Sequence, residues 1–294
     1  MVTNSIKAVL QKAAKLLKDS GSPSAILDAE LLLLHVYRLH GVDMNKIRLI
    51  TNCNDEVPEA LTEQYQDFVA QRCQGKPVQY ITGLQEFMGL ELTVAEGVLI
   101  PRGDTEIIVE KVLELADHEK FLHIIDMCTG TGAIAISLAH FLPKAWVTAV
   151  DISDIALQCC KTNIEKHHLQ ERVRAVQSNL FEDLTRTDFT NNIDMIVSNP
   201  PYIPKADIGA LDVNVRDYEP ALALDGGLDG LDFYRRIVCD GAELLKSGGI
   251  LAFEIGYNQG QDVLNIIKES QSYYDLECFQ DLAGLDRCII ARRR

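Results

Sequence analysis

Strand-like and helix-like segments alternate along the chain from about residue 104 onward, and this alternation constrains the fold more than any other feature. Short apolar runs are typical of strands buried on both faces, and the helices between them allow successive strands to run parallel. The pattern predicts an α/β domain with helices on both faces of a mainly parallel sheet. The expected strands cover residues 121–128, 146–151, 173–180, 193–202, 250–256, 274–281 and 286–292, and the expected helices cover residues 105–117, 132–142, 154–169, 230–246 and 259–270.

Two segments have the pattern of β-hairpins. Only the short turn at residues 281–286 separates the last two expected strands, so we expect them to pair antiparallel at an edge of the sheet. Residues 77–100 contain alternating apolar positions around Gly89, which predicts a second hairpin that links two domains. Its side chains Phe87, Met88 and Leu90 are large and apolar, and we expect them to be packed.

The first 76 residues have helical spacing instead. Apolar residues recur every three or four positions over residues 6–17, and Gly21 follows as a stop. Ser22 and Pro23 offer a cap and a first-turn proline to a second helix over residues 25–39. A third expected helix covers residues 58–73. We therefore expect a helical N-terminal domain over residues 1–76, a hairpin linker over residues 77–100 and the α/β domain over residues 101–294.

Composition argues against binding to nucleic acid, a membrane or a metal ion. The formal net charge is −15, whereas proteins that hold nucleic acid through its phosphates need a positive surface, so we expect no direct nucleic-acid binding. No apolar run approaches the roughly 20 residues of a membrane span, and the lysine-rich start does not resemble a signal peptide. The eight cysteines form no CxxC pair and no metal-ligand spacing. We expect a cytoplasmic, monomeric protein without a bound metal.

A glycine-containing loop follows the first strand of the α/β domain. It consists of Asp126, Met127, Cys128, Thr129, Gly130, Thr131 and Gly132, and it opens a helix. Ligands of open α/β sheets bind beyond the carboxyl ends of the strands, and the next strand ends in Asp151, which can accept hydrogen bonds from both ribose hydroxyls. A dinucleotide fits a loop with Gly130, Gly132 and Ala135. S-adenosyl-L-methionine fits a loop with Asp126 near its amino acid end, so both cofactor classes remain open.

The segment Asn199, Pro200, Pro201, Tyr202 follows the fourth strand at the same predicted edge. Two prolines end the strand and leave rigid carbonyl groups without their own N–H donors. Asn199 Oδ1 and the Pro200 carbonyl can accept the two N–H groups of a planar amide or amino nitrogen and stabilise the positive charge that develops on it. Tyr202 can pack over the planar group. The segment predicts methyl transfer to such a nitrogen, driven by positioning and without a dedicated general base.

Three other functions compete with this interpretation. An adenine-specific DNA methyltransferase uses the same tetrapeptide, but the net charge of −15 argues against it. A nicotinamide-dependent oxidoreductase leaves the tetrapeptide unexplained. A binding module without catalysis leaves Asn199 and Tyr202 unexplained.

Longer motifs resemble the release factor glutamine methyltransferases, also called the PrmC or HemK family, over nearly the whole chain. The segments that carry the resemblance are residues 77–92, 99–106, 125–139, 198–204 and 218–237. The resemblance implies a seven-stranded, Rossmann-like class I methyltransferase domain that uses S-adenosyl-L-methionine and releases S-adenosyl-L-homocysteine. The implied substrate is the glutamine of the Gly-Gly-Gln loop of bacterial peptide chain release factors, which becomes N5-methylglutamine. A glutamine of a ribosomal protein is the alternative substrate.

The resemblance also implies roles for individual residues. The cofactor contacts of the family correspond to Cys128 through Gly132, its ribose-binding acid to Asp151, and its adenine-side position to Leu180. Its glutamine-binding tetrapeptide corresponds to residues 199–202, in which Asn199, Pro200 and Tyr202 are the implied catalytic residues and Asn199 also borders the cofactor. The helical N-terminal domain is implied to hold the release factor.

This sequence departs from the family pattern at three positions. Cys128 stands where the family usually has glycine, Gly103 where it has proline, and Leu180 where an aromatic residue is common. Two nearby charged residues, Arg102 and Glu106, either border the cofactor or form a surface ion pair with each other.

Overall fold

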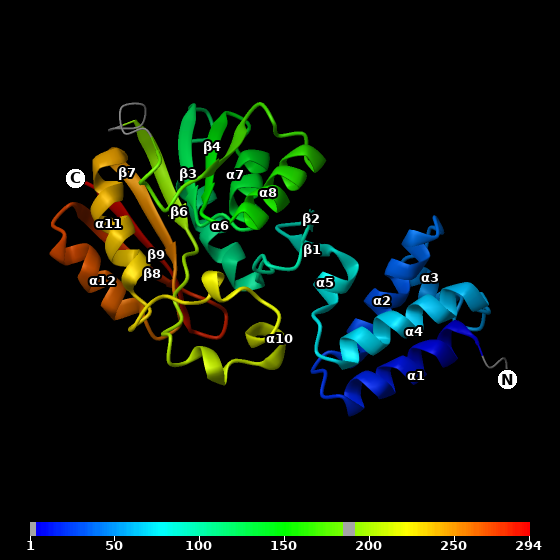
Figure 1. Cartoon of the computed structure of the whole chain (residues 1–294). Coiled ribbons are helices and arrows are strands. Elements are labelled where there is room, and N and C mark those ends of the chain that lie inside the picture. The colour runs from blue at the N-terminus through cyan, green and yellow to red at the C-terminus, as the bar shows by residue number, and fades with distance from the viewer. Residues whose placement is uncertain (1–3, 185–191) are drawn as a thin grey trace. The chain divides into compact units, whose positions relative to one another are not determined.

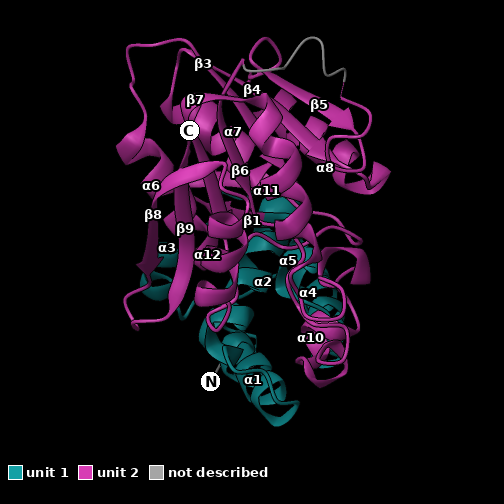
Figure 2. Cartoon of the chain, turned by 90° about the vertical axis from the view of Figure 1, so that its left-hand side faces the viewer, with its two compact units in different colours: residues 1–84 teal, residues 85–294 magenta. Residues whose placement is uncertain are grey.

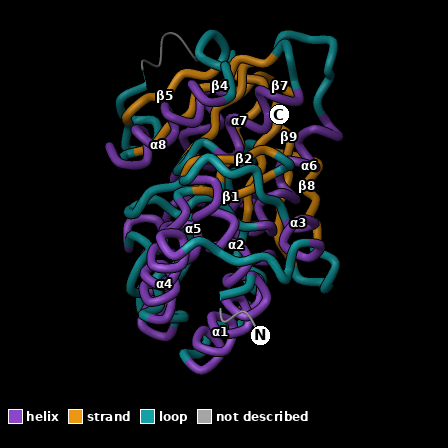
Figure 3. The backbone as a smooth tube through the Cα atoms, turned by 90° about the vertical axis from the view of Figure 1, so that its right-hand side faces the viewer, coloured by secondary structure: helices purple, strands orange, loops and turns teal. Residues whose placement is uncertain are grey.

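The computed structural model describes residues 4–184 and 192–294, and the chain divides into two compact units. Unit 1 is Met1–Leu84 and unit 2 is Gln85–Arg294 (Figure 2). Each unit has its own buried apolar core. Unit 1 is built from helices and turns, whereas unit 2 is organised around strands (Figure 3).

The expected helices of unit 1 are confirmed, and two short ones join them. Leu17, Leu32 and Leu33 are fully buried in its core, as their helical spacing indicates. Helix α2 begins after Ser24, later than the expected cap at Ser22, because both serine hydroxyls donate to the Asp28 carboxylate instead. The helices are α1 (Ile6–Asp19), α2 (Ala25–Leu39), α3 (Lys46–Thr51), α4 (Glu59–Cys73) and α5 (Val78–Thr82), of which the sequence pattern did not indicate α3 and α5.

The first hairpin is shorter than expected. Helix α5 occupies its predicted beginning, because Val78 and Tyr80 bury their side chains against helical neighbours. Strands β1 (Leu84–Phe87) and β2 (Leu90–Thr93) then pair across Met88 and Gly89, which both have positive φ as tight hairpin turns require. Phe87 and Leu92 are buried in the main core of unit 2, which confirms that the apolar side chains of this segment are packed.

Unit 2 contains the expected sheet of seven strands, in the order β5-β4-β3-β6-β7-β9-β8. All neighbouring pairs are parallel except those of β9, which runs antiparallel to both β7 and β8. The predicted α/β fold and its antiparallel edge hairpin are therefore confirmed. The strands are β3 (Leu122–Met127), β4 (Ala145–Asp151), β5 (Val173–Gln177), β6 (Ile193–Ser198), β7 (Leu245–Glu254), β8 (Tyr273–Gln280) and β9 (Asp286–Arg293).

Helices cover both faces of this sheet (Figure 1). Two separate apolar clusters form, one on each face, because every central strand is buried on both sides. One face carries α6 (Glu106–Leu115), α7 (Ala133–Phe141) and α8 (Asp154–Lys166), and the other carries α11 (Asp232–Leu244) and α12 (Gly260–Glu269). Among the residues that the structure describes, no helix combines the length and the apolar character needed to cross a membrane.

Short elements flank the sheet where the sequence pattern gave no regular prediction. They are the turns η1 (Gly103–Thr105), η2 (Ile208–Ala210) and η3 (Ala221–Ala223), and the helix α10 (Val213–Arg216). The last three lie in the long connection between β6 and α11.

Strand β3 lies at the point where the strand order reverses, with β4 on one side and β6 on the other. Met127 on β3 is level with Val150 on β4 and with Ser198 on β6. Because the three strands are parallel and in register, the residues that follow them leave the sheet side by side. Cys128, Asp151 and Asn199 therefore meet at one edge, where open α/β sheets bind ligands.

Candidate active site

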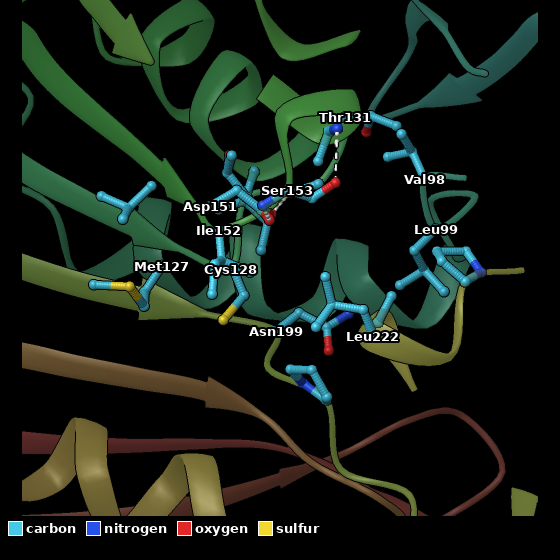
Figure 4. Close-up of a pocket in the computed structure, with 18 of the residues that line it drawn as sticks. Val98, Leu99, Met127, Cys128, Thr131, Asp151, Ile152, Ser153, Asn199 and Leu222 are labelled. Carbon is cyan, nitrogen blue, oxygen red and sulfur yellow. Dashed lines mark hydrogen bonds between the residues drawn. The ribbon is translucent and has the colours of Figure 1, made fainter. Parts of the chain in front are cut away.

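A pocket lies at this edge of the sheet, and we call it the sheet-edge pocket. Figure 4 shows Thr131 and Val98 at one end, Asn199 and Leu222 at the other, and Asp151 and Cys128 along the wall between them. Its lining comes from residues 97–99, 101 and 105, from the ends of strands β3 to β6 with the residues that follow them, from residues 220, 222 and 223, and from Phe233.

The glycine loop, residues 126–132, forms one wall of the pocket through Cys128, Thr129, Gly130 and Thr131. Cys128 and Gly130 have φ values of 63° and 56°, so the chain turns sharply through the left-handed region. Gly132 follows with φ 83° at the start of α7, and a Cβ atom there would lie 2.7 Å from Cys160 Sγ. The loop thus depends on the absence of a side chain at position 132.

Asp126 does not line the pocket. Its carboxylate is fully buried behind the glycine loop, where Oδ2 accepts hydrogen bonds from Thr129 Oγ1 at 2.5 Å and from the Ala135 N–H at 3.0 Å. Oδ1 has no hydrogen-bond partner within residues 4–184 and 192–294, and burial raises the pKa of this carboxyl to about 7. These contacts tie the loop to the first turn of α7, so Asp126 shapes the loop from behind.

Asp151 does line the pocket, at the carboxyl end of β4. Its Oδ2 accepts the Gly130 N–H and its Oδ1 accepts the Ser153 N–H, both at 2.9 Å. Burial raises the pKa of Asp151, and these backbone N–H groups oppose the rise. Each carboxylate oxygen has a second lone pair, so Asp151 can still accept hydrogen bonds from a ligand's hydroxyl groups.

Apolar side chains form the wall next to Asp151. Leu180 is buried and lines the pocket, and its φ of 54° is unusual for a branched residue. Ile152 and Phe233 also line the pocket. A flat apolar group such as a purine base can therefore be enclosed here, although Leu180 itself offers no aromatic face.

The tetrapeptide, residues 199–202, forms the opposite end of the pocket. Asn199 and Pro201 line it, whereas Pro200 is buried and Tyr202 packs against the core on the α11 and α12 face of the sheet. The Tyr202 carbonyl accepts a hydrogen bond from Gln259 Nε2 at 2.9 Å, which ties the segment down. Within the described parts of the chain, the Pro200 carbonyl accepts no hydrogen bond, so it can accept one from a ligand.

Two buried polar residues accompany Asn199. Its Nδ2 donates to Thr105 Oγ1 at 3.2 Å. Glu254, the last residue of β7, is 3% exposed, and burial raises its pKa to about 7 while the Thr105 and Asn199 side chains oppose the rise through hydrogen bonds. The sequence pattern did not indicate Thr105 or Glu254, because nothing in the local pattern marks which residues will face Asn199.

Arg102 and Glu106 do not pair with each other. Arg102 forms an ion pair with Glu219 at 2.5 Å, and the Glu219 side chain is 1% exposed. Glu106 Oε1 accepts the Met88 N–H of the first hairpin at 2.7 Å. The Arg102–Glu219 pair joins the segment before η1 to the connection that precedes η3, and both segments contribute pocket-lining residues.

The structure thus brings most of the predicted site residues to one pocket. Asp151, Leu180, Asn199, Pro201 and residues 128–131 line it, whereas Asp126, Gly132, Pro200 and Tyr202 lie directly behind it. The sequence pattern did not indicate the lining residues Val98, Leu99, Ser153, Leu222 and Phe233.

Family models match both units. A model described as the PrmC N-terminal domain matches residues 8–83, and one described as the methyltransferase small domain matches residues 104–214. A solved methyltransferase from Pyrococcus furiosus has the same fold, with a TM-score of 0.51 and 18% identity over 77% of this chain and 96% of its own.

Full-length relatives are much closer in sequence. The release factor glutamine methyltransferase of Clostridium acetobutylicum is 40% identical over 98% of both chains. That of Moorella thermoacetica is 42% identical over 98% of this chain and 99% of its own. With this similarity over nearly its entire length, and with a sheet-edge pocket that joins the glycine loop to an Asn-Pro-Pro-Tyr segment, the chain belongs to the release factor glutamine methyltransferase family.

Proposed function

We propose that this protein transfers a methyl group from S-adenosyl-L-methionine to the side-chain amide nitrogen of the glutamine in the Gly-Gly-Gln loop of bacterial peptide chain release factors. The products are N5-methylglutamine and S-adenosyl-L-homocysteine. One observation carries the proposal: Asn199 lines the same pocket as the glycine loop and Asp151. A nitrogen held by Asn199 therefore faces a donor that is held by the loop.

The pocket residues fit this donor. The carboxylate of Asp151 can accept the ribose hydroxyls, and Leu180 with Ile152 can enclose the adenine. The open backbone of residues 128–131 provides room for the amino acid end, while Asp126 holds the loop in shape. When bound, the donor supplies a methyl group that is activated by its positively charged sulfur.

The tetrapeptide supplies the acceptor site. Asn199 Oδ1 and the Pro200 carbonyl accept the two amide N–H groups of glutamine, which fixes the nitrogen and directs it at the methyl carbon. A nitrogen–carbon bond forms as the carbon–sulfur bond breaks, and the nitrogen then loses a proton to water. Tyr202, which packs against the core behind the pocket and not over the expected amide plane, anchors the end of the tetrapeptide. Burial raises the pKa of Tyr202 above its usual value, so it remains a neutral phenol during the reaction.

We assign the release factor contact to the helical N-terminal domain over residues 1–76, with residues 77–100 as a linker and residues 101–294 as the methyltransferase domain. Three isoleucines support this role because their side chains are strongly exposed: Ile26 at 70%, Ile47 at 72% and Ile50 at 66%. Such side chains can be buried against a partner protein.

Mass spectrometry tests the proposal directly. Purified release factor is incubated with the full-length protein and S-adenosyl-L-methionine, and the peptide that contains Gly-Gly-Gln is analysed. We expect a gain of one methyl group on the glutamine. A release factor in which this glutamine is replaced by alanine is the matched control and should gain none.

Two further substrates test the alternatives. Purified ribosomal proteins and double-stranded DNA are incubated under the same conditions. Methylation of either one without methylation of the release factor would overturn the proposal.

A further inference from the structure

Glu254 is a buried charged residue that the proposed methyl transfer does not use. It ends β7, which pairs with β6 so that Phe253 lies level with Ser198. The next residues, Glu254 at the end of β7 and Asn199 directly after β6, therefore lie side by side. Among the residues that the structure describes, none forms a hydrogen bond with Glu254 Oε2. A buried polar atom without a partner calls for an explanation, such as a functional role.

The surroundings of Glu254 bear on how the side-chain amide of Asn199 is oriented. Asn199 Nδ2 donates to Thr105 Oγ1 at 3.2 Å. The Thr105 and Asn199 side chains both lie close enough to the Glu254 carboxyl to hold its pKa down against the effect of burial. The NH2 group of Asn199 is thereby directed at Thr105, on the side where Glu254 lies. Its Oδ1 is left as the group that can meet a ligand, and an oxygen at that point is what an acceptor N–H requires.

We propose that Glu254 is a positioning residue for methyl transfer, whose ionised carboxylate holds the Thr105 hydroxyl and the Asn199 NH2 group so that Asn199 Oδ1 faces the substrate nitrogen. This inference rests on the proposed function of the tetrapeptide. It adds a requirement that the tetrapeptide alone does not contain, namely a negative charge behind Asn199.

The charge matters because an ionised carboxylate can only accept hydrogen bonds. Its neighbours must then donate, which fixes the direction of the Thr105 hydroxyl and of the Asn199 amide. A protonated Glu254 can donate to Thr105, and the Thr105 hydroxyl can then donate to Asn199 Oδ1, which turns the amide over. The active orientation is therefore favoured above the pKa of Glu254 and is lost as the pH falls through it.

Several groups set that pKa. Burial is the largest influence and raises it to about 7. The Asp104 carboxylate raises it further and the Arg287 guanidinium lowers it, and these two form an ion pair at 3.0 Å. The other titratable groups that face Glu254 are Tyr202, Tyr234 and Cys288, in which burial raises the pKa, so they stay neutral near pH 7.

The experiment compares Glu254→Gln with the unaltered full-length protein across pH 5.5 to 8.5, using purified release factor and S-adenosyl-L-methionine. For the unaltered protein we expect kcat to rise about tenfold as the pH passes through about 7. The variant should lose about 10²-fold in kcat at pH 8, since a comparable loss follows removal of one oriented group from an active site. Its kcat should no longer rise with pH, and its KM for the donor should change less than threefold.

Two control sets separate positioning from folding. Glu277→Gln removes a carboxylate from the exposed surface of β8 and should leave both kcat and its pH dependence unchanged. Thr105→Val removes the linking hydroxyl and should also reduce kcat, whereas Thr105→Ser keeps the hydroxyl and should recover most of it. This pair tests the same chain of contacts even if Glu254→Gln fails to fold.

Each outcome bears on a distinct claim. If the unaltered protein does not methylate the release factor, the proposed function fails. If it does, but Glu254→Gln keeps its kcat and the rise with pH, the positioning role of Glu254 is overturned. A Thr105→Val variant as active as Thr105→Ser would overturn it as well.

Discussion

The two loops that meet in the sheet-edge pocket are held in place by opposite means. The glycine loop, residues 126–132, takes its shape from positive φ angles and from one place where no Cβ atom fits. The tetrapeptide, residues 199–202, takes its shape from two prolines that remove backbone freedom. Both loops follow neighbouring parallel strands, and each has a buried carboxyl group behind it: Asp126 in the first case and Glu254 in the second.

Under the proposed function, the difference follows from what each loop holds. A donor with many polar and apolar groups is wrapped by a backbone that approaches closely, which requires glycine. An amide nitrogen needs only two acceptors, but these must be fixed in direction to stabilise developing charge. We therefore expect changes in the first loop to alter donor binding and stability, and changes in the second to alter the chemical step.

Asn199→Ala should have the largest effect. Removing Oδ1 deprives the substrate's amide nitrogen of one of its two proposed hydrogen-bond acceptors. We therefore expect kcat to fall by at least about 10²-fold, comparable to the loss of one oriented hydrogen-bonding group in other active sites. Donor affinity, measured by calorimetry, should change less than threefold. Turnover close to that of the unaltered protein in a mass-spectrometric assay would contradict the role of the tetrapeptide.

Asp151→Ala should disturb the donor side of the pocket, where Asp151 accepts the Gly130 N–H of the glycine loop. We expect it to weaken donor binding more than it lowers kcat. It removes the acceptor for the ribose hydroxyls and also frees the Gly130 N–H. We expect donor affinity to fall by about tenfold, which is the loss of one or two hydrogen bonds to a charged group. At saturating donor, kcat should fall less than it does in Asn199→Ala. An unchanged calorimetric dissociation constant would remove Asp151 from the donor site.

Gly132→Ala tests how tightly the glycine loop is packed. Gly284 in the turn between β8 and β9 has a similar φ, 79° against 83°, but a Cβ atom at that position would have nothing within 4 Å, so Gly284→Ala is a matched control for backbone strain alone. Gly132→Ala should lower the free energy of unfolding by about 1–3 kcal/mol more than the control, because the new methyl group overlaps Cys160. Equal losses in denaturant titrations would show that the loop relaxes around it.

Cys128 gives the smallest expected effect. Its φ of 63° favours glycine, so Cys128→Gly should be more stable than Cys128→Ala by about 1 kcal/mol. This order is opposite to that at ordinary positions, where alanine is the more stable residue. Denaturant unfolding of the two variants measures it. If Cys128→Ala proves the more stable of the two, the left-handed backbone at position 128 does not favour glycine.

The sequence pattern predicts most of the fold of unit 2, because continuous apolar runs mark the strands that are buried on both faces and a period of three to four residues marks the amphipathic helices. It fails at α3 and α5, which are too short for a period to show, and in the connection between β6 and α11, whose turns depend on packing. It also places the cap of α2 too early, since a distant residue decides the outcome: Arg72 binds Asp28, and Asp28 binds both serines.

For the site, the chain alone determined the two loops of the proposed site, because glycine permits and proline imposes particular backbone angles wherever they occur. Only the tertiary structure decided which side chains stand behind them. Strand register brings Glu254 next to Asn199. Asp126 turns away from the pocket toward α7. Nothing in the sequence around Glu254 or Asp126 indicates which way either carboxyl group points. Pairing between strands far apart in the chain sets these positions, and no local pattern records it.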